Sequence, residues 1–391
     1  MTHTSPPQPL NPPVTSPAPP TATRRTPPTP LADEPISEEF REQITATLTA
    51  FISQRQLALA ALGDDLDPLF VTASHYLTGG KRLRPAFAYW GWRSAGGKPD
   101  KTDAIVSAAA AIELVHASAL VHDDVMDDSA TRRGRPAAHH EFASRRAERL
   151  GVEPTDPIVR RYGRSAAILL GDMLLSWSDQ LLMTSGFKPK AVARGRVYFD
   201  KLRTEVVAGQ FLDVLAQTSS TSSSSDAMRI VRYKSAKYTV ERPLQFGAVL
   251  AKADLPLLTA LSSYGVPLGE AFQLRDDLLG VLGESIQTGK PSGDDIREGK
   301  RTLLIARAHQ LATPAQRDVL SANFANPQIS TEGVASVQEV LRATGAVKAV
   351  ETVITELTAA ALAALAHAPI SDEAARSALR VLSDRVTNRT V

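Results

Sequence analysis

Apolar residues recur at three- and four-residue spacing over most of the chain beyond residue 35. This spacing places them on one face of a helix, and the alternating pattern typical of strands is scarce. Alanine and leucine dominate these stretches, which extend over residues 104–121, 166–183, 191–215, 231–253, 257–282, 302–311 and 347–366. The sequence therefore predicts an all-α fold with about ten or more helices.

The first 35 residues have a different composition, with 12 of the 26 prolines and almost no large apolar side chains. Such a segment buries too little surface to offset the entropy lost on ordering. We therefore predict a disordered Pro-rich tail over residues 1–35 and a folded domain over residues 36–391. Ser37 is expected to cap the first helix of that domain.

Two stretches without helical periodicity are predicted to be loops. Residues 217–225 read QTSSTSSSS, a polar segment that we expect to connect two helices. Residues 137–159 are highly charged and contain Pro154 and Pro157, so we expect a second loop there.

The composition excludes several classes of protein and site. The 44 Lys and Arg residues nearly balance the 42 Asp and Glu residues, so the net charge of +2 gives no overall attraction to nucleic acid. The absence of cysteine excludes disulfides, thiolate zinc sites, iron–sulfur clusters and a thiol nucleophile. The most apolar window, residues 104–121, contains polar residues and is predicted to be a buried helix rather than a transmembrane segment. With no secretory signal at the N-terminus, we expect a cytoplasmic protein.

An acidic cluster follows this most apolar window. Asp123 and Asp127 are four residues apart and share one helix face, and Asp124 and Asp128 form a second such pair. Carboxylates at the C-terminal end of a helix repel each other and are unfavourable next to the helix dipole, so a cation is the natural compensation. Oxygen ligands without cysteine indicate a hard ion, Mg²⁺ or Mn²⁺.

Basic residues and a second acidic pair extend this pattern. Arg132, Arg133 and Arg135 follow the first cluster, and carboxylates beside arginines suggest a metal-bridged phosphate or diphosphate. Asp276 and Asp277 end another apolar stretch, and two facing carboxylate walls can hold several Mg²⁺ ions around one diphosphate. Residues 79–85 read GGKRLRP, in which glycines allow close backbone approach and three cations follow. This loop is not a P-loop, because the GxxxxGK[ST] pattern is missing.

Six motifs occur together in this chain. They are GGKRLRP (79–85), DDVMD (123–127), RRGRP (132–136), GQFLD (209–213), YKSAKYT (233–239) and FQLRDD (272–277). In these motifs and their order, residues 36–391 resemble the trans-isoprenyl diphosphate synthases (polyprenyl synthetase family), and among them the geranylgeranyl diphosphate synthases. The resemblance implies a single large helical-bundle domain with a deep central cavity, and a homodimer. It also implies a prenyltransferase that joins isopentenyl diphosphate to dimethylallyl, geranyl or farnesyl diphosphate.

The resemblance further assigns roles to individual residues. Asp123 and Asp127 would bind Mg²⁺ ions that bridge the allylic diphosphate, and Asp276, with Asp277, would hold a further ion from the opposite wall. The positions that match isopentenyl diphosphate contacts are Lys81, Arg84, His116 and Arg133. Those that match allylic diphosphate contacts are Arg132, Lys234, Ser235, Gln273, Lys290 and Lys300. The residues expected to carry catalysis are Asp123, Asp127, Arg132, Lys234 and Asp276.

The chain departs from the family pattern at two positions. Gly280 stands where the second motif usually ends in Asp, which puts one metal or water contact in doubt, but Asp276 is expected to carry the main contact. Ser235 stands where the family usually has Thr, and a hydroxyl is kept.

The residues before the first acidic cluster bear on product length. Ala119, Ser118 and Val115 lie one and two helical turns before Asp123 and are all small or modest in size. In the family an aromatic residue there closes the pocket at fifteen carbons, so this chain is expected to make a longer product. Twenty carbons is the first expectation, with Met173 and Leu174 as candidate caps of the pocket.

Three alternatives fit these motifs less well. A class I terpene cyclase shares the fold, but its second metal motif is usually of the N-S-E type, and this chain has an Asp pair and the GGKR loop. A non-catalytic synthase subunit would be expected to lose its aspartates, and both clusters are intact. A purely structural helical protein would need neither cluster.

Overall fold

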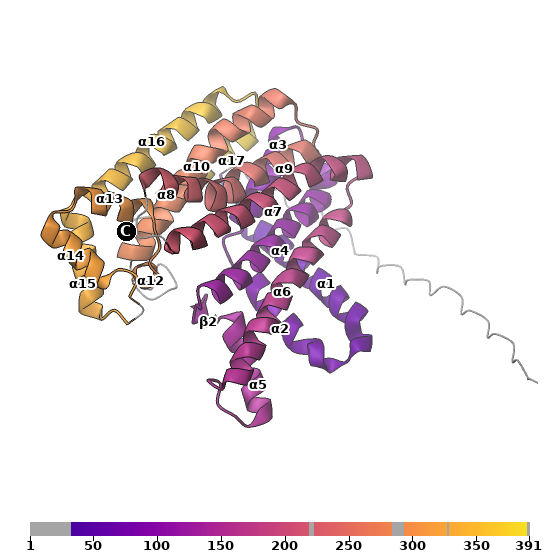
Figure 1. Cartoon of the computed structure of the whole chain (residues 1–391). Helices are drawn as coiled ribbons and strands as arrows, with labels where there is room; N and C mark the ends of the chain where they lie inside the picture. Colours follow the sequence, from indigo (N-terminus) through magenta and orange to yellow (C-terminus); the bar gives the residue numbers. More distant parts are fainter. Residues whose placement is uncertain (1–32, 219–222, 284–292, 327, 389–391) are drawn as a thin grey trace, which may run out of the picture.

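The computed structural model describes residues 33–218, 223–283, 293–326 and 328–388 (Figure 1). The elements of the first half are α1 (Glu38–Leu59), η1 (Ala60–Leu62), η2 (Asp64–Leu66), α2 (Asp67–Leu77), α3 (Leu83–Ser94), η3 (Pro99–Lys101), α4 (Thr102–Met126), β1 (Thr131–Arg132), β2 (Arg135–Pro136), α5 (Ala138–Leu150), α6 (Pro157–Met183) and α7 (Pro189–Gln217). Those of the second half are α8 (Ser224–Ile230), η4 (Val231–Glu241), α9 (Arg242–Leu250), α10 (Leu255–Leu282), α12 (Asp294–Arg297), α13 (Leu303–Leu311), α14 (Pro314–Asn323), α15 (Thr331–Ala343), α16 (Ala346–His367) and α17 (Glu373–Thr387). The predicted all-α fold is confirmed, because the antiparallel pair β1–β2 is the only sheet among the described residues.

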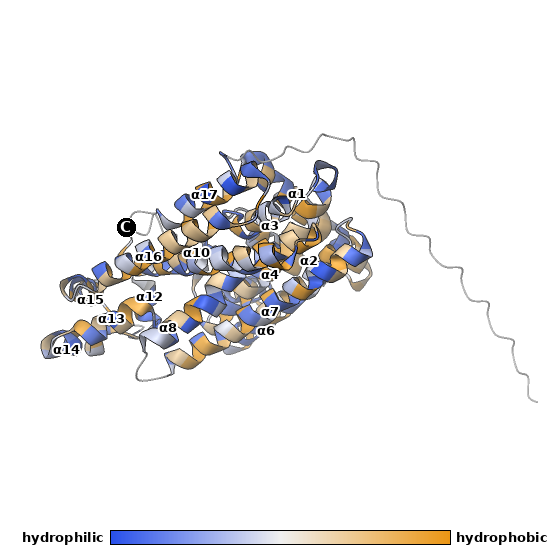
Figure 2. Ribbon diagram, turned by 90° about the horizontal axis from the view of Figure 1, so that it is seen from above, coloured by the Kyte–Doolittle hydropathy of each residue, from blue (hydrophilic) through white to orange (hydrophobic). Residues whose placement is uncertain are grey.

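The main hydrophobic core surrounds α4. The four consecutive alanines Ala108–Ala111 are fully buried, and these small side chains let α3, α6 and α1 pack closely against the helix. In Figure 2 hydrophobic and hydrophilic stretches lie along the same helices, as expected for helices that bury one face. The buried α4 therefore holds the acidic cluster at its C-terminal end on a rigid support.

A second, smaller core lies under α13, α15 and α16. The long helix α10 contributes to both cores, with Leu261 and Leu268 in the first and Leu274 and Leu278 in the second. The second acidic pair lies on the part of α10 that enters the smaller core. This helix thus fixes the position of the second pair relative to the first.

The loop predicted over residues 137–159 is wrong for most of its length, because α5 occupies residues 138–150 (Figure 1). His139, Phe142 and Ala143 bury one face of this helix, and α5 packs mainly against α6. The charged residues that suggested a loop lie on its other faces, and Pro157 is tolerated because it occupies the first position of α6. The true connection is short, residues 151–156.

The predicted cap of the first helix is confirmed. The Ser37 side chain accepts a hydrogen bond from the Phe40 amide and so caps α1. Just before it, Pro35 is buried and its carbonyl accepts a hydrogen bond from Trp90 Nε1 at 2.9 Å. The predicted tail, apart from residues 33–35, lies outside the described residues. The predicted polar loop falls between α7 and α8, and residues 219–222 of it also lie outside them.

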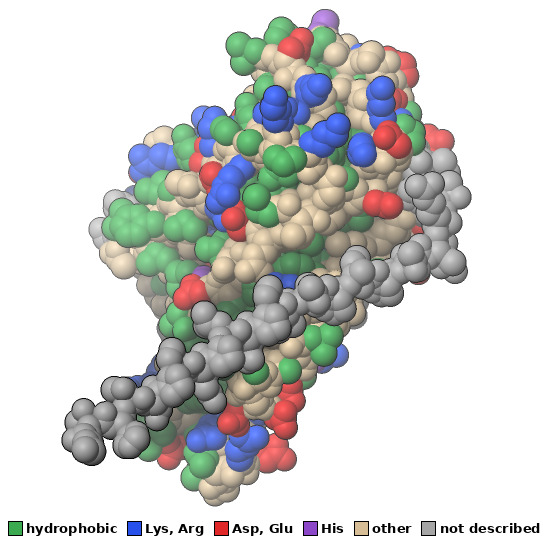
Figure 3. Space-filling view, turned by 90° about the vertical axis from the view of Figure 1, so that its right-hand side faces the viewer, with side chains coloured by type: hydrophobic (Ala, Val, Ile, Leu, Met, Phe, Trp, Pro, Cys, Tyr) green, Lys and Arg blue, Asp and Glu red, His purple; other side chains and the backbone are tan. Residues whose placement is uncertain are grey.

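Within the part of the chain that the structure describes, two helical segments are long and apolar enough to cross a membrane by length and composition alone. The first, Pro99–Met126, has 78% of its apolar window buried inside the protein, as expected for the core helix predicted from the sequence. The second is α16, with 22% of its window buried. Its buried residues, among them Val350, Ile354 and Ala361, face the core, and its exposed residues include Lys348, Glu356 and several alanines. Figure 3 shows one face of the molecule, on which side chains of both charge signs lie among hydrophobic ones.

Candidate active site

A polar cavity of about 800 Å³ opens between the C-terminal end of α4, the helices α7, η4 and α10, and the segment that begins at α12. Most of the residues predicted to contact metal and diphosphate line it. The predicted residues in its wall are Lys81, Asp123, Arg132, Lys234, Ser235, Gln273, Asp276, Asp277 and Lys300. Residues more than 200 positions apart in the sequence thus meet in one space. Lys290 lies outside the described residues.

The two i,i+4 pairs of the first acidic cluster have different surroundings. Asp123 lines the cavity, and its Oδ1 accepts a hydrogen bond from Gln210 Nε2 at 2.8 Å. Asp124 is fully buried and accepts hydrogen bonds from the Tyr76 hydroxyl, at 2.7 Å, and from Arg132 Nε, at 2.8 Å. Asp124 therefore anchors the fold, whereas Asp123 lines the cavity. Asp127, four residues further along, lies near Asp123, Lys234 and Lys300.

Asp127 shows how concentrated the negative charge is. Burial and the nearby Asp123 carboxylate raise the pKa of Asp127 to about 6. An acid whose pKa rises on folding destabilises the folded protein when it is ionised. A divalent cation between the two carboxylates would remove this cost, so the site is electrostatically suited to bind one.

Lys234, which lies on the π-helix η4, offsets the negative charge of these carboxylates. Its Nζ lies 2.6 Å from Asp213 Oδ2 and 3.5 Å from Asp123 Oδ1. Burial opposes the positive charge, but the two carboxylates outweigh it and raise the pKa of Lys234. Gly209 makes this contact possible, since a Cβ there would lie 2.4 Å from the backbone nitrogen of Lys234. The GQFLD motif thus supplies a glycine that allows close helix packing and two polar side chains. Gln210 contacts Asp123, and Asp213 contacts Lys234.

The second acidic pair lies on the opposite wall. Asp277 is buried and accepts a hydrogen bond from Gln273 Nε2 at 2.8 Å, one helical turn earlier. Burial, followed by the Asp295 and Asp276 carboxylates, raises the pKa of Asp277 to about 7. Lys300 Nζ lies 2.8 Å from both Asp295 Oδ1 and Glu298 Oε2. This wall therefore also concentrates carboxylates that a cation would stabilise.

The structure places another carboxylate beside Gly280, the position where the family usually has Asp. A Cβ built on Gly280 would lie 2.1 Å from Asp295 Oδ2. The Asp295 carboxylate, which lines the same cavity, thus occupies the space beside Gly280. Asp295 is not among the residues predicted from the sequence, although the acidic and basic residues clustered at 294–301 were a signal for it.

The residues predicted to contact isopentenyl diphosphate gather beside the cavity at the end of α2 and the start of α3. His116 faces a group of arginines, and burial together with Arg84, Arg133 and their neighbours keeps the pKa of His116 well below its usual range. Its imidazole is therefore neutral at physiological pH. The Arg133 guanidinium donates to the Thr78 carbonyl at 3.0 Å and lies against Gly80, which ties the RRGRP hairpin to the GGKRLRP loop.

Tyr238 of η4 completes this basic group and was missed by sequence analysis. The Arg84 guanidinium carbon lies 4.4 Å from the centre of the Tyr238 ring, and the hydroxyl of Tyr238 lies 3.3 Å from His116 Nδ1. Arg82, in contrast, has a structural role, because its guanidinium is buried and lies 2.5 Å from the Glu113 carboxylate. Arg84, Arg133 and His116 thus remain available to bind an anion.

The residues predicted to close the prenyl pocket lie on α4 and α6, two helices that pack against each other. Val115 and Ser118 are buried and Ala119 is partly buried. On α6, Leu174 is fully buried in the main core and Met173 packs against it. The role of these residues in product length remains a prediction.

Comparison with known proteins identifies the family. The sequence profile of the polyprenyl synthetase family matches residues 67–343. The chain belongs to the polyprenyl synthetase family. It is therefore a prenyltransferase, and the matched segment contains every predicted site residue.

Solved and curated members of the polyprenyl synthetase family agree with this. The geranylgeranyl pyrophosphate synthase of Corynebacterium glutamicum, solved with isoprenyl diphosphate and magnesium, superposes with a TM-score of 0.86 at 39% identity, over 90% of this chain and 99% of that one. The short chain isoprenyl diphosphate synthase of Methanothermobacter thermautotrophicus is 30% identical over 83% of this chain and 92% of its own length. The geranylfarnesyl diphosphate synthase of Aeropyrum pernix is 30% identical over 80% and 91%, respectively.

Proposed function

We propose that this prenyltransferase condenses isopentenyl diphosphate with an allylic diphosphate to give an all-trans prenyl diphosphate, geranylgeranyl diphosphate or a longer one. One observation carries the proposal: two carboxylate walls, on α4 and α10, face a single cavity that has a group of arginines beside it. This arrangement suits two diphosphates, one bridged by metal ions and one held by cations. The names of the relatives above support the same chemistry.

Mg²⁺ is the proposed cofactor, with Mn²⁺ as a second candidate. Asp123 and Asp127 would hold ions from α4, and Asp276, with Asp277 and Asp295, would hold one from α10. Bound Mg²⁺ supplies the positive charge that stabilises the departing diphosphate. The donors are carboxylate oxygens, which Mg²⁺ prefers, and the raised pKa values of Asp127 and Asp277 are consistent with sites that gain from a cation.

The cationic side chains around the cavity would hold the allylic diphosphate. Lys234, Arg132 and Lys300 surround it, and the Gln273 amide and the Ser235 hydroxyl supply neutral contacts. Each of the three cations is already paired with a carboxylate, so it is held in place before substrate arrives. The family resemblance also assigns Lys290 to this group.

Arg84, Arg133, His116 and Lys81 would bind isopentenyl diphosphate. The C–O bond of the allylic substrate then breaks, its C1 forms a bond with the terminal carbon of isopentenyl diphosphate, and one proton is lost. The departed diphosphate is the proposed acceptor of that proton. The lowered pKa makes His116 a weak base, which fits this scheme, in which its imidazole acts as a hydrogen-bond donor.

The experiment that tests the proposal measures diphosphate release. With Mg²⁺, release should require both isopentenyl diphosphate and an allylic diphosphate, because condensation consumes the two together. Release from an allylic diphosphate alone would instead indicate a terpene cyclase. Release under neither condition would leave a non-catalytic subunit as the better account.

A homodimer is the proposed assembly, and α6 and α7 are its proposed interface. These two helices expose a row of apolar side chains, Ile168, Leu169, Val207, Phe211 and Leu215, and Phe211 is 68% exposed. Exposed apolar residues in this number are typical of a protein interface. A cytoplasmic location is proposed as well.

Phe211→Lys should weaken this dimer, because it places a charge in the middle of the apolar row. The dissociation constant of the dimer should rise at least about tenfold, as for an aromatic residue central to an interface. Light scattering coupled to size-exclusion chromatography, over a dilution series, measures this. Leu57→Lys, at a residue of α1 that is 77% exposed, is the matched control and should leave the dimer intact. Equal dissociation of both variants, or of neither, would place the interface elsewhere.

Gly280→Asp should lower activity, although it restores the residue usual in the family. The new side chain would collide with the Asp295 carboxylate and displace it from the cavity. A displacement of about 1 Å at such a site costs up to about a hundredfold in rate, so we expect a ten- to hundredfold loss of kcat. Asp295→Asn should lower kcat in the same range. An increase in kcat for Gly280→Asp would show that the chain lacks a ligand there and that Asp295 does not replace it.

A further inference from the structure

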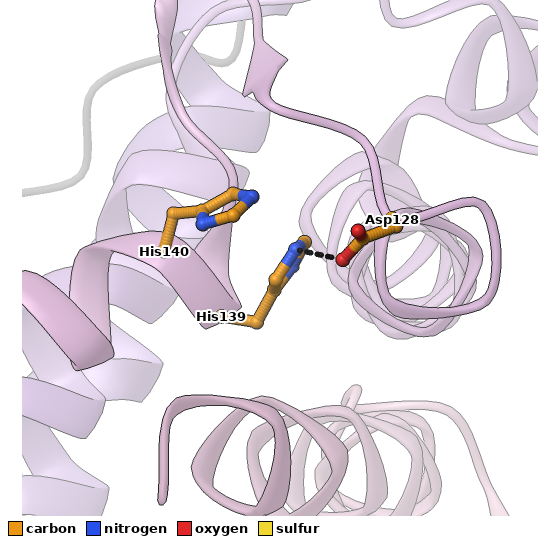
Figure 4. Close-up of side chains that lie close together, drawn as sticks. All are labelled: Asp128, His139 and His140. Atoms are coloured by element: carbon orange, nitrogen blue, oxygen red, sulfur yellow. Dashed lines mark ion pairs between the residues drawn. The ribbon is translucent and has the colours of Figure 1, made fainter. Parts of the chain in front are cut away.

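A second group of potential metal ligands lies outside the cavity, where the end of α4 meets the start of α5. Asp128 follows the last residues of α4, and His139 and His140 lie in the first turn of α5 (Figure 4). One ligand atom from each of the three side chains lies within 4.8 Å of the others. Asp128 Oδ1 lies 3.6 Å from His139 Nε2, and the two imidazole rings are 4.1 Å apart between centroids.

His139 makes this group unusual. The residue is 4% exposed, and within the described part of the chain neither of its ring nitrogens has a hydrogen-bond partner. A buried polar group without a partner costs about 1–3 kcal/mol, so native proteins nearly always satisfy such groups. The ion-pair distance to Asp128 is too long for a hydrogen bond. A ligand between the three side chains would satisfy the buried imidazole.

The donor set indicates which kind of ligand. Two imidazoles and one carboxylate suit Zn²⁺ and similar transition metals, whereas Mg²⁺ prefers oxygen donors alone. Neighbouring ligands in tetrahedral Zn²⁺ sites are about 3.4 Å apart, given bonds of about 2.1 Å. The distance of 3.6 Å between Asp128 Oδ1 and His139 Nε2 is already close to this value. The His140 ring nitrogen, within 4.8 Å of the other two ligand atoms, would reach it by a side-chain rotation.

The accessibility of the three residues also fits a metal site. The Asp128 side chain is 60% exposed and His140 is partly buried, so both can adjust and solvent can reach the fourth coordination position. The charged or titratable groups that face His139 are Asp128, Asp124, His140 and Arg164. Arg164 opposes a cation, and the Asp124 carboxylate is already paired with Arg132. Asp128 therefore supplies the main local attraction.

We propose that Asp128, His139 and His140 bind one transition-metal ion of the Zn²⁺ type, at a site separate from the Asp123, Asp127 and Asp276 carboxylates. The ion would join the end of α4 to the start of α5. These two points enclose the β1–β2 hairpin, which carries Arg132 and Arg133. The metal would thus brace the hairpin without contacting the substrates.

Zn²⁺ titration of the full-length protein tests this site directly. Calorimetry in excess Mg²⁺ should show one Zn²⁺ per chain, and Co²⁺ as a probe should give the intense visible absorption of a tetrahedral site. His140→Ala should weaken Zn²⁺ binding at least about tenfold and abolish the Co²⁺ band, as expected on loss of a ligand. His140 is partly exposed, so this variant should fold normally, which circular dichroism checks.

Two further variants separate this site from the others. Asp123→Asn should retain the Co²⁺ band, because Asp123 belongs to the cavity. His367→Ala removes an exposed imidazole of α16 and should also bind Zn²⁺ like the wild type. Equal Zn²⁺ affinity and stoichiometry in wild type and His140→Ala would overturn the proposal, as would a Co²⁺ band that disappears in Asp123→Asn. Neither result bears on prenyl transfer, because the readouts involve no substrate.

Discussion

Asp127→Asn should lower kcat by about a thousandfold while it stabilises the metal-free protein. The loss of rate follows from removing a ligand for the ions that stabilise the leaving diphosphate, a contribution of the order seen for strong electrostatic groups in active sites. The gain in stability follows from the pKa of Asp127, which folding raises to about 6. Above pH 6 the ionised carboxylate therefore costs folding free energy, and the neutral amide does not. Steady-state kinetics and thermal unfolding at pH 8 measure the two effects.

Asp124→Asn is the matched control on the same helix. It should lower Tm instead of raising it, because Asp124 is fully buried and pairs with Arg132 and Tyr76. The expected Tm increase for Asp127→Asn is a few °C. A Tm decrease in both variants, or wild-type turnover in Asp127→Asn, would contradict the division of the cluster into a metal face and a structural anchor.

Ala119→Phe should shorten the product to fifteen carbons. Ala119 lies one helical turn before Asp123 on α4, and a phenyl ring there would fill the space predicted for the growing prenyl chain. We expect the main product to change from geranylgeranyl diphosphate or longer to farnesyl diphosphate. Mass spectrometry of the products, after incubation with excess isopentenyl diphosphate, measures this.

Leu120→Phe is the control for this substitution. It adds the same ring one residue further along the helix, about 100° around the axis, and should leave the main product unchanged. If Ala119→Phe left product length as in the wild type, the pocket floor would lie elsewhere, and Met173 of α6 would be the next residue to substitute.

The sequence predicted the helices well where one face is continuously apolar, as in α4 and α10. It failed for α5, because that helix is short and highly charged, and only Phe142 and a few small residues mark its buried face. The charge run and the flanking prolines outweighed that weak periodicity. Tertiary packing against α6 stabilises this helix, and local sequence does not report such packing.

The candidate site, like the fold, could be predicted only in part from the sequence. The acidic and basic motifs were evident from residue types and spacing. Their distances were not, since Lys234, Asp123 and Asp213 come from three separate helices that meet through the close packing at Gly209. Asp295 beside Gly280 is a contact between residues on separate elements, so single-motif reasoning could only record Gly280 as a departure. The buried, unpartnered His139 likewise became visible only in three dimensions.

The most direct test of the central claim is the incorporation of labelled isopentenyl diphosphate into prenyl products. Purified protein is incubated with Mg²⁺, isopentenyl diphosphate and, separately, dimethylallyl, geranyl or farnesyl diphosphate. We predict Mg²⁺-dependent incorporation with at least one of these primers, and a main product of twenty carbons or more. No incorporation with any primer, by protein that is folded and binds Mg²⁺, would contradict the account.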